Sequence, residues 1–174
     1  IGNGLAEDSL RPTTFKKRYV VENQKLFRVS RLEDQNINSE IETQLIRKLE
    51  EIAPKINGIV VSDFVYGVVT KRVLNTIYDL AEKYGVPLFG DLQCSSQVGQ
   101  VTKFRDFSLL CPNEREVRIA LQDKEIGLER LSHQLLEKTS SERLIMKLGA
   151  EGFIAYDYSD NKSGFSQPFP ALSV

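Results

Sequence analysis

The chain has 174 residues, of which 41% are hydrophobic, and its 23 basic and 24 acidic side chains give a net charge of −1. This length corresponds to about one domain with a substantial core, and no apolar run is long enough to span a membrane. The balanced charge argues against nucleic acid or an anionic membrane as a partner. Cys94 and Cys111 lack metal-ligand spacing, so we expect reduced thiols in a cytoplasmic protein.

Residues 13–31 alternate apolar and polar side chains on both sides of the polar Glu22-Asn23-Gln24 break, which predicts a β-hairpin. Phe15, Tyr19, Phe27 and Val29 give this hairpin an apolar face that needs covering. We therefore expect a lid, or a flap through which two copies form a dimer.

Helical spacing begins after Asn38, where Ser39 and Glu42 form a possible capping box, and it ends before Pro54. A β-branched run then predicts a buried strand over residues 59–63. Thr70 to Tyr84 follows as a helix, with Gly85 as its left-handed stop, and the next strand covers residues 87–91.

The second half of the chain continues the alternation of strands and helices. We predict a strand over 107–111, a helix from Asn113, a helix over 128–139, and strands over 144–147 and 153–157. Asn113 and Glu116 have the spacing of a capping box. The fold class is therefore α/β, with a mostly parallel sheet and helices on both faces. The chain starts and stops within such patterns, so we expect a partial domain over residues 1–174, with the hairpin at 13–31 and the α/β core at 38–174.

Four predicted strands end in residues suited to binding. Two of them end in Asp63 and Asp91, and the other two are followed by Asn113 and by the glycines Gly149 and Gly152. In a parallel sheet these ends meet at one edge, where such folds bind phosphates and other anions. For each one alone, simple termination of a strand or a tight turn explains the residue equally well. The single histidine, His133, falls on a helix surface, and Cys94-Ser-Ser96 has no candidate base, so a nucleophilic triad is poorly supported.

Four motifs, in this order, resemble the ribokinase-like (PfkB) sugar kinases over nearly the whole chain. They are Arg11-Pro-Thr-Thr-Phe-Lys-Lys-Arg18, Val60-Val-Ser-Asp63 with Gly67, Pro112-Asn-Glu-Arg-Glu116, and Leu148-Gly-Ala-Glu-Gly152. Within this family the chain is most similar to the heptose 7-phosphate kinase domain of ADP-heptose synthesis enzymes. The resemblance implies a ribokinase-like three-layer fold, and transfer of phosphate from ATP to a sugar or sugar phosphate.

The resemblance also implies roles for particular residues. Asn113 and Glu116 would organise Mg²⁺ and phosphates, with Glu116 serving the metal, and Lys147, Gly149 and Gly152 would bind the nucleotide. On the substrate side it implies lid and strand-end residues, namely Arg11, Thr13, Thr14, Lys16, Asp63 and Asp91. The expected ligands are ATP, Mg²⁺ and a small sugar, and the expected partner is a second copy bound through the hairpin.

The chain departs from the heptose branch in three positions. Val65-Tyr66 and Leu92-Gln93 stand where that branch carries lysines that bind phosphate, and Lys147 replaces a common threonine. The expected substrates therefore include an uncharged sugar, and a sugar phosphate that is bound by residues other than these lysines.

The family's Gly-Ala-Gly-Asp motif, which holds the catalytic base, does not occur in the chain. We expect it after Val174, so this chain alone should be inactive. The alternative is a non-catalytic module that binds a nucleotide or sugar. A dinucleotide-dependent enzyme is disfavoured because no Gly-x-Gly-x-x-Gly follows a predicted strand.

Overall fold

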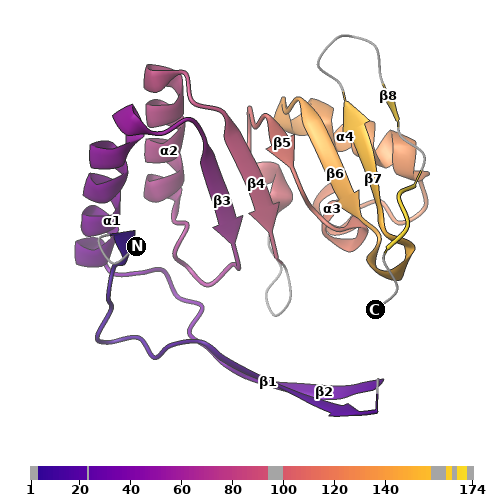
Figure 1. The fold of residues 1–174 in the computed structure, drawn as a ribbon, viewed down its shortest axis with the longest axis horizontal. Helices are drawn as coiled ribbons and strands as arrows, with labels where there is room; N and C mark the ends of the chain where they lie inside the picture. Colours follow the sequence, from indigo (N-terminus) through magenta and orange to yellow (C-terminus); the bar gives the residue numbers. More distant parts are fainter. Residues whose placement is uncertain (1–3, 23, 94–99, 158–163, 166–167, 172–174) are drawn as a thin grey trace.

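The computed structural model describes residues 4–22, 24–93, 100–157, 164–165 and 168–171 (Figure 1). A six-stranded sheet, ordered β3-β4-β5-β6-β7-β8, forms the body of the molecule. The first four strands are parallel, and β7 and β8 return antiparallel. From β3 to β8, in that order, the strands span Ile59–Asp63, Leu88–Leu92, Leu109–Leu110, Arg143–Lys147, Phe153–Asp157 and Gly164–Phe165. The mostly parallel sheet predicted from the sequence is confirmed.

Within the described ranges, four α-helices lie along the sheet, together with short 3₁₀ turns. Their bounds are Ser39–Ile52 for α1, Lys71–Tyr84 for α2, Glu114–Leu121 for α3 and Leu128–Thr139 for α4; the 3₁₀ turns are η2 (Ala53–Lys55), η3 (Val101–Lys103) and η4 (Gly149–Glu151). None of the helices in the described residues has the length and apolar character needed to cross a bilayer.

The helices of the described residues pack on one face of the sheet. In β3, Ile59 and Val61 are buried beneath them, whereas Val60 between the two is 73% exposed. The register places Gly90, Leu110 and Leu144 on the same buried face as Val61. The alternation of strands and helices along the chain predicts helices on both faces. In the described residues, buried and exposed side chains instead alternate along β3, as they do in a sheet with one covered face.

The core is densest where β4 meets η3 and the segment leading into β5. A side-chain carbon on Gly90 would lie 3.0 Å from each of Leu110, Phe104 and Phe107, so glycine lets these rings close onto the sheet. The Phe104 and Phe107 rings stack with centroids 4.8 Å apart and are fully buried.

Local capping explains most helix boundaries. Thr70 caps α2 by accepting a bond from the Val73 amide, so the helix begins at Lys71, and Gly85 ends it at φ 63°, as predicted. The predicted Ser39–Glu42 capping box is wrong. Asn38 is the N-cap of α1, because its side chain accepts bonds from the Glu40 and Ile41 amides. The Glu42 carboxylate instead accepts a bond from the Thr70 hydroxyl at 2.5 Å and pairs with Arg72.

The hairpin predicted at 13–31 is also present. It consists of β1 (Phe15–Val21) and β2 (Gln24–Arg31), which pair with each other and form a sheet of their own. Figure 1 shows it extending away from the body, on the side toward which the carboxyl ends of β3 and β4 point. It is therefore a separate element placed near the edge of the sheet that we expected to hold a site.

Candidate functional site

The carboxyl ends of β3, β4, β5 and β6 meet at one edge of the sheet, since these strands are parallel and adjacent. This edge brings together Asp91, Asn113, Lys147 and the turn that contains Gly149 and Gly152. Cys94, Ser95 and Ser96 lie outside the described residues.

An ion pair joins two of the expected site residues across this edge. The Lys147 Nζ lies 2.6 Å from the Asp91 Oδ1, and both side chains are part-exposed, at 39% and 29%. Both belong to the face of the sheet that the helices leave open, because Met146 and Gly90 beside them are buried on the other face. The half-buried Cys111 is close enough for both charges to act on it. Burial raises the pKa of its thiol, the Asp91 carboxylate raises this pKa further, and Lys147 opposes the rise.

The N-terminus of α3 stands beside this pair. Lys147 forms a parallel bridge with Asn113, and its amide donates to the Pro112 carbonyl at 2.9 Å. Asn113 and Glu116 form the predicted capping box, since each side chain accepts a 2.8 Å bond from the other residue's amide. Glu116 is only 3% exposed. Its position is thus explained by the cap, and its expected role with metal stays a prediction.

The turn after β6 is a tight connection to β7, which was the alternative interpretation of its glycines. Leu148 donates to the Gly152 carbonyl at 2.7 Å, and η4 lies between them. Gly152 has φ 91° and ψ −126°, and a side-chain carbon there would lie 1.7 Å from the Phe169 carbonyl oxygen. Gly149 has φ 66°, and a carbon there would meet no described atom within 4 Å. The two glycines therefore differ, because Gly152 is required by packing and Gly149 faces open space.

Asp63 is placed differently from Asp91. It belongs to the helix-covered face and is 3% exposed. Its Oδ1 accepts a 2.8 Å bond from the Val65 amide, and its Oδ2 pairs with the Lys103 ammonium. The structure therefore separates the two aspartates onto opposite faces of the sheet, although they follow neighbouring strands.

The expected lid residues approach the loop after β3. Arg11 donates to the Tyr66 carbonyl at 2.7 Å and also to the Gln35 carbonyl. The Lys16 ammonium lies 4.9 Å from the Tyr66 ring centroid and 5.3 Å from that of Phe64. Thr13 and Thr14 are exposed. Arg11 thus anchors the base of the hairpin, and Lys16 is held at the end of β3.

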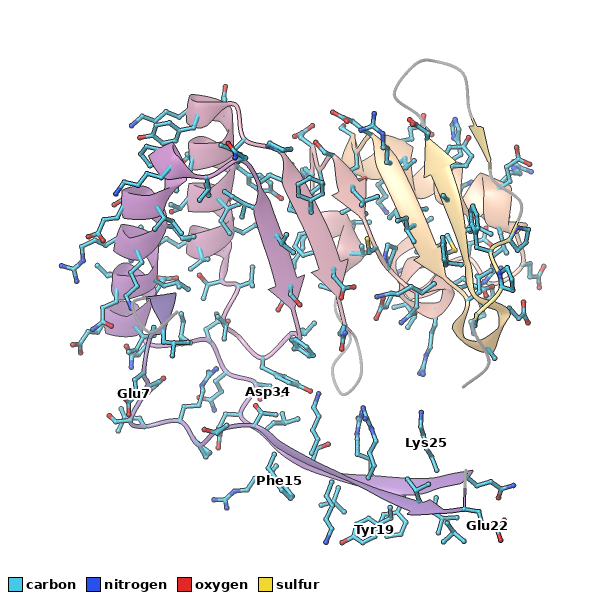
Figure 2. The ribbon with its side chains drawn as sticks, viewed as in Figure 1. Glu7, Phe15, Tyr19, Glu22, Lys25 and Asp34 are labelled. Carbon is cyan, nitrogen blue, oxygen red and sulfur yellow. The ribbon has the colours of Figure 1, made fainter. Side chains whose placement is uncertain are left out.

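The two faces of the hairpin differ in character, which was not predicted from the sequence. Figure 2 shows Phe15 and Tyr19 pointing away from the strand ends and Lys25 pointing toward them. The register places on the Lys25 side a set of further residues that is mostly basic: Lys16, Arg18, Val20, Arg28 and Ser30. We call these residues, with Lys25, the inner face. The alternation of Lys16, Arg18 and Val20 was the signal available in the sequence, and it needed the register of β2 to become a surface.

The chain is similar to known proteins in sequence and in fold. The family model described as pfkB family carbohydrate kinase matches residues 12–174. The chain is 31% identical over 153 residues to the bifunctional protein HldE of Geotalea uraniireducens, and 29% identical over 139 residues to that of Helicobacter pylori strain J99. These alignments cover 86% and 79% of this chain but only 30% and 29% of those proteins.

Solved structures share the fold. Ribokinase from Giardia lamblia aligns with a TM-score of 0.66 and 16% identity, over 89% of this chain and 48% of that one. Phosphofructokinase-2 from Escherichia coli in complex with fructose-6-phosphate aligns with a TM-score of 0.58 and 15% identity, over 85% and 49%. The chain thus spans about half the length of these structures and less than a third of the curated relatives.

Proposed function

Because this chain belongs to the pfkB family of carbohydrate kinases, we propose that it contributes the nucleotide side and the lid of a site that phosphorylates a sugar phosphate with ATP and Mg²⁺. The proposal rests on one observation: Asp91, Lys147 and the N-terminus of α3 meet at the carboxyl ends of the parallel strands. Phosphoryl transfer asks a protein chiefly to position its reactants and to neutralise charge. A carboxylate, an ammonium group and a helix N-terminus supply these requirements.

On the nucleotide side, Lys147 and Gly149 have the properties that phosphate binding needs. Lys147 offers an accessible positive charge, and Gly149 leaves open space beside its backbone. Asn113 and Gly152 shape this region by capping α3 and by closing the turn after β6.

The residues present fit a Mg²⁺ ion that arrives with the nucleotide. No cluster of three or more metal-binding side chains occurs among the described residues, so a site built from protein ligands alone is not supported there. Mg²⁺ usually binds through one or two carboxylates together with substrate phosphates and water. Asp91 is the accessible carboxylate, and Glu116, expected to serve the metal, would act from its buried position through water. The ion would neutralise the charge that builds up on the phosphates.

On the substrate side, the inner face of the hairpin favours an anionic sugar. The heptose branch carries phosphate-binding lysines after the positions of Asp63 and Asp91, and this chain has none there. Lys16 nevertheless stands over Phe64 and Tyr66, next to the first of these positions, and Lys147 stands beside Asp91. Ammonium groups from other elements thus occupy the region where those lysines are missing. This favours a heptose 7-phosphate-like substrate, with Arg11, Thr13, Thr14 and Asp63 shaping its surroundings.

The face of the hairpin opposite the inner face, which we call the outer face, carries the exposed apolar residues Phe15, Tyr19, Phe27 and Val29, and it suggests a homodimer. Tyr19 and Phe27 stack at 4.4 Å between ring centroids and are 37% and 56% exposed. An exposed apolar face on a two-stranded sheet is stabilised when a partner covers it.

The test is transfer of phosphate from ATP to a panel of sugars and sugar phosphates by the whole protein, with and without Mg²⁺. We expect turnover with a phosphorylated sugar and loss of at least about tenfold in Asp91→Asn. Nucleotide binding without turnover on any sugar would favour the non-catalytic module instead. The absence of both binding and turnover would refute the proposal.

A further inference from the structure

Among the described residues, two lysine–aspartate pairs have their aspartates on the adjacent strands β3 and β4, and the pairs differ in accessibility. Asp63 and Lys103 lie on the helix-covered face, and both oxygens of Asp63 accept bonds from the protein. Asp91 and Lys147 lie on the open face at the strand ends. Opening the first pair would leave a buried carboxylate without its cation, which is costly. A part-exposed pair such as the second contributes roughly 0–1 kcal/mol, so it can open at little cost.

From this contrast we infer that Asp91 and Lys147 exchange partners when the nucleotide binds. In the free protein each neutralises the other. In the complex, the Lys147 ammonium moves onto the phosphates, and the Asp91 carboxylate takes the Mg²⁺ that they carry. Lys147 is thereby the residue that makes affinity depend on the phosphates, and Asp91 is the residue that makes it depend on the metal. This inference rests on the proposed nucleotide site.

Charge balance makes the exchange a coupled event. If Lys147 left Asp91 for the phosphates without a replacement cation, an unpaired carboxylate would face several phosphate charges across a short distance. Mg²⁺ supplies that replacement, so the two partners can exchange only together. Metal-free nucleotide should therefore bind weakly, because it leaves the Asp91 carboxylate without a cation.

The experiment measures dissociation constants by calorimetry for adenosine, ADP and ATP, with and without Mg²⁺, on the whole protein and three variants. Lys147→Met should weaken binding of ATP and ADP by about tenfold or more and leave adenosine unchanged. Asp91→Asn should bind metal-free ATP more tightly than the unaltered chain does, and Mg²⁺ should improve its affinity by only about two- to threefold. In the unaltered chain Mg²⁺ should improve affinity by about tenfold or more.

Lys103→Met is the matched control, since it opens the other pair and should leave the ratio of ATP to adenosine affinity unchanged. A melting curve for each variant separates lost binding from lost folding. Equal ATP affinity in Lys147→Met and the unaltered chain, or the same Mg²⁺ dependence in Asp91→Asn, would overturn the exchange while leaving the nucleotide site in place. If the unaltered chain binds none of the three ligands, the proposed nucleotide site itself is wrong.

Discussion

At the scale of single residues, Glu116 has two possible roles that leave different traces. It closes the capping box with Asn113, and it is the residue expected to serve Mg²⁺. Glutamine also serves in a capping box, so Glu116→Gln should change the free energy of unfolding little. If Glu116 helps to organise the metal, the same change should raise the Mg²⁺ concentration needed for half-maximal turnover of the whole protein.

Asn113→Ala is the comparison for this test. It removes the side chain that accepts a hydrogen bond from the Glu116 amide, so it should lower the free energy of unfolding by about 1 kcal/mol, as measured by denaturant titration. Wild-type turnover and unaltered Mg²⁺ dependence in Glu116→Gln would show that this residue only caps α3 and does not organise the metal.

Cys111 reports on the charges beside it. Its pKa is raised by burial and by Asp91, and the thiolate is the reactive form, so alkylation by iodoacetamide should be slow and should rise only at a pH above the ordinary thiol range. In a Cys94→Ser background, Asp91→Asn should speed alkylation at pH 8 and Lys147→Met should slow it. Equal rates in the two variants would show that neither charge acts on the thiol.

At the scale of elements, the turn between β6 and β7 separates a packing glycine from a candidate binding glycine. Gly152→Ala places a carbon into the Phe169 carbonyl at a backbone conformation that only glycine adopts easily, so it should cost about 1–3 kcal/mol of stability. Gly149→Ala meets open space and should cost about 1 kcal/mol, but it should weaken ATP binding if phosphates approach there. Unchanged ATP affinity in Gly149→Ala, measured by calorimetry, would leave the turn with a structural role only.

The hairpin makes a second prediction at this scale. Phe27→Glu places a charge on the outer face and should shift the protein from dimer to monomer in sedimentation velocity. Val20→Glu is the matched control, because Val20 is similarly exposed but belongs to the inner face, so it should leave the dimer intact. A monomer in the unaltered protein, or equal effects of both changes, would show that the outer face does not bind a second copy.

The elements were predictable from sequence where a local signal fixes them. The bounds of α2 follow from its caps and apolar spacing, those of α4 follow from its apolar spacing, and the capping box at Asn113 marks the start of α3. The start of α1 was misplaced because Asn38 and Ser39 are both good caps, and only the geometry decides between them. The Asp91–Lys147 pair could not be predicted, since 56 residues separate its partners and their meeting depends on β5 lying between β4 and β6. The inner face of the hairpin was missed for the same reason, because Lys25 and Arg28 join Lys16 and Arg18 only through the register.

At the scale of the whole molecule, the faces of the sheet were the feature that sequence alone did not resolve. An apolar run such as Ile59-Val60-Val61 fits both a strand covered on two faces and a strand covered on one. The choice depends on what packs against the sheet, and in the described residues the four helices pack on the same side. The opposite side carries Val60, with Phe89, Leu109, Ile145 and Ala155 half-buried along it.

Two neighbouring valines in β3 test this one-sided arrangement directly. Val61 is 4% exposed and lies against the helices, so Val61→Thr buries a hydroxyl among apolar side chains and should cost about 1–3 kcal/mol. Val60 is 73% exposed, and Val60→Thr keeps its shape and its β-branching, so the free energy of unfolding should stay within about 0.5 kcal/mol. Urea denaturation of the 174-residue chain measures both changes.

Equal losses of stability in the two variants would mean that both faces of the sheet are covered in solution, for instance by association of two chains. In that case the comparison repeated at tenfold lower protein concentration should recover the difference, because dilution separates associated chains and leaves an intramolecular core unchanged.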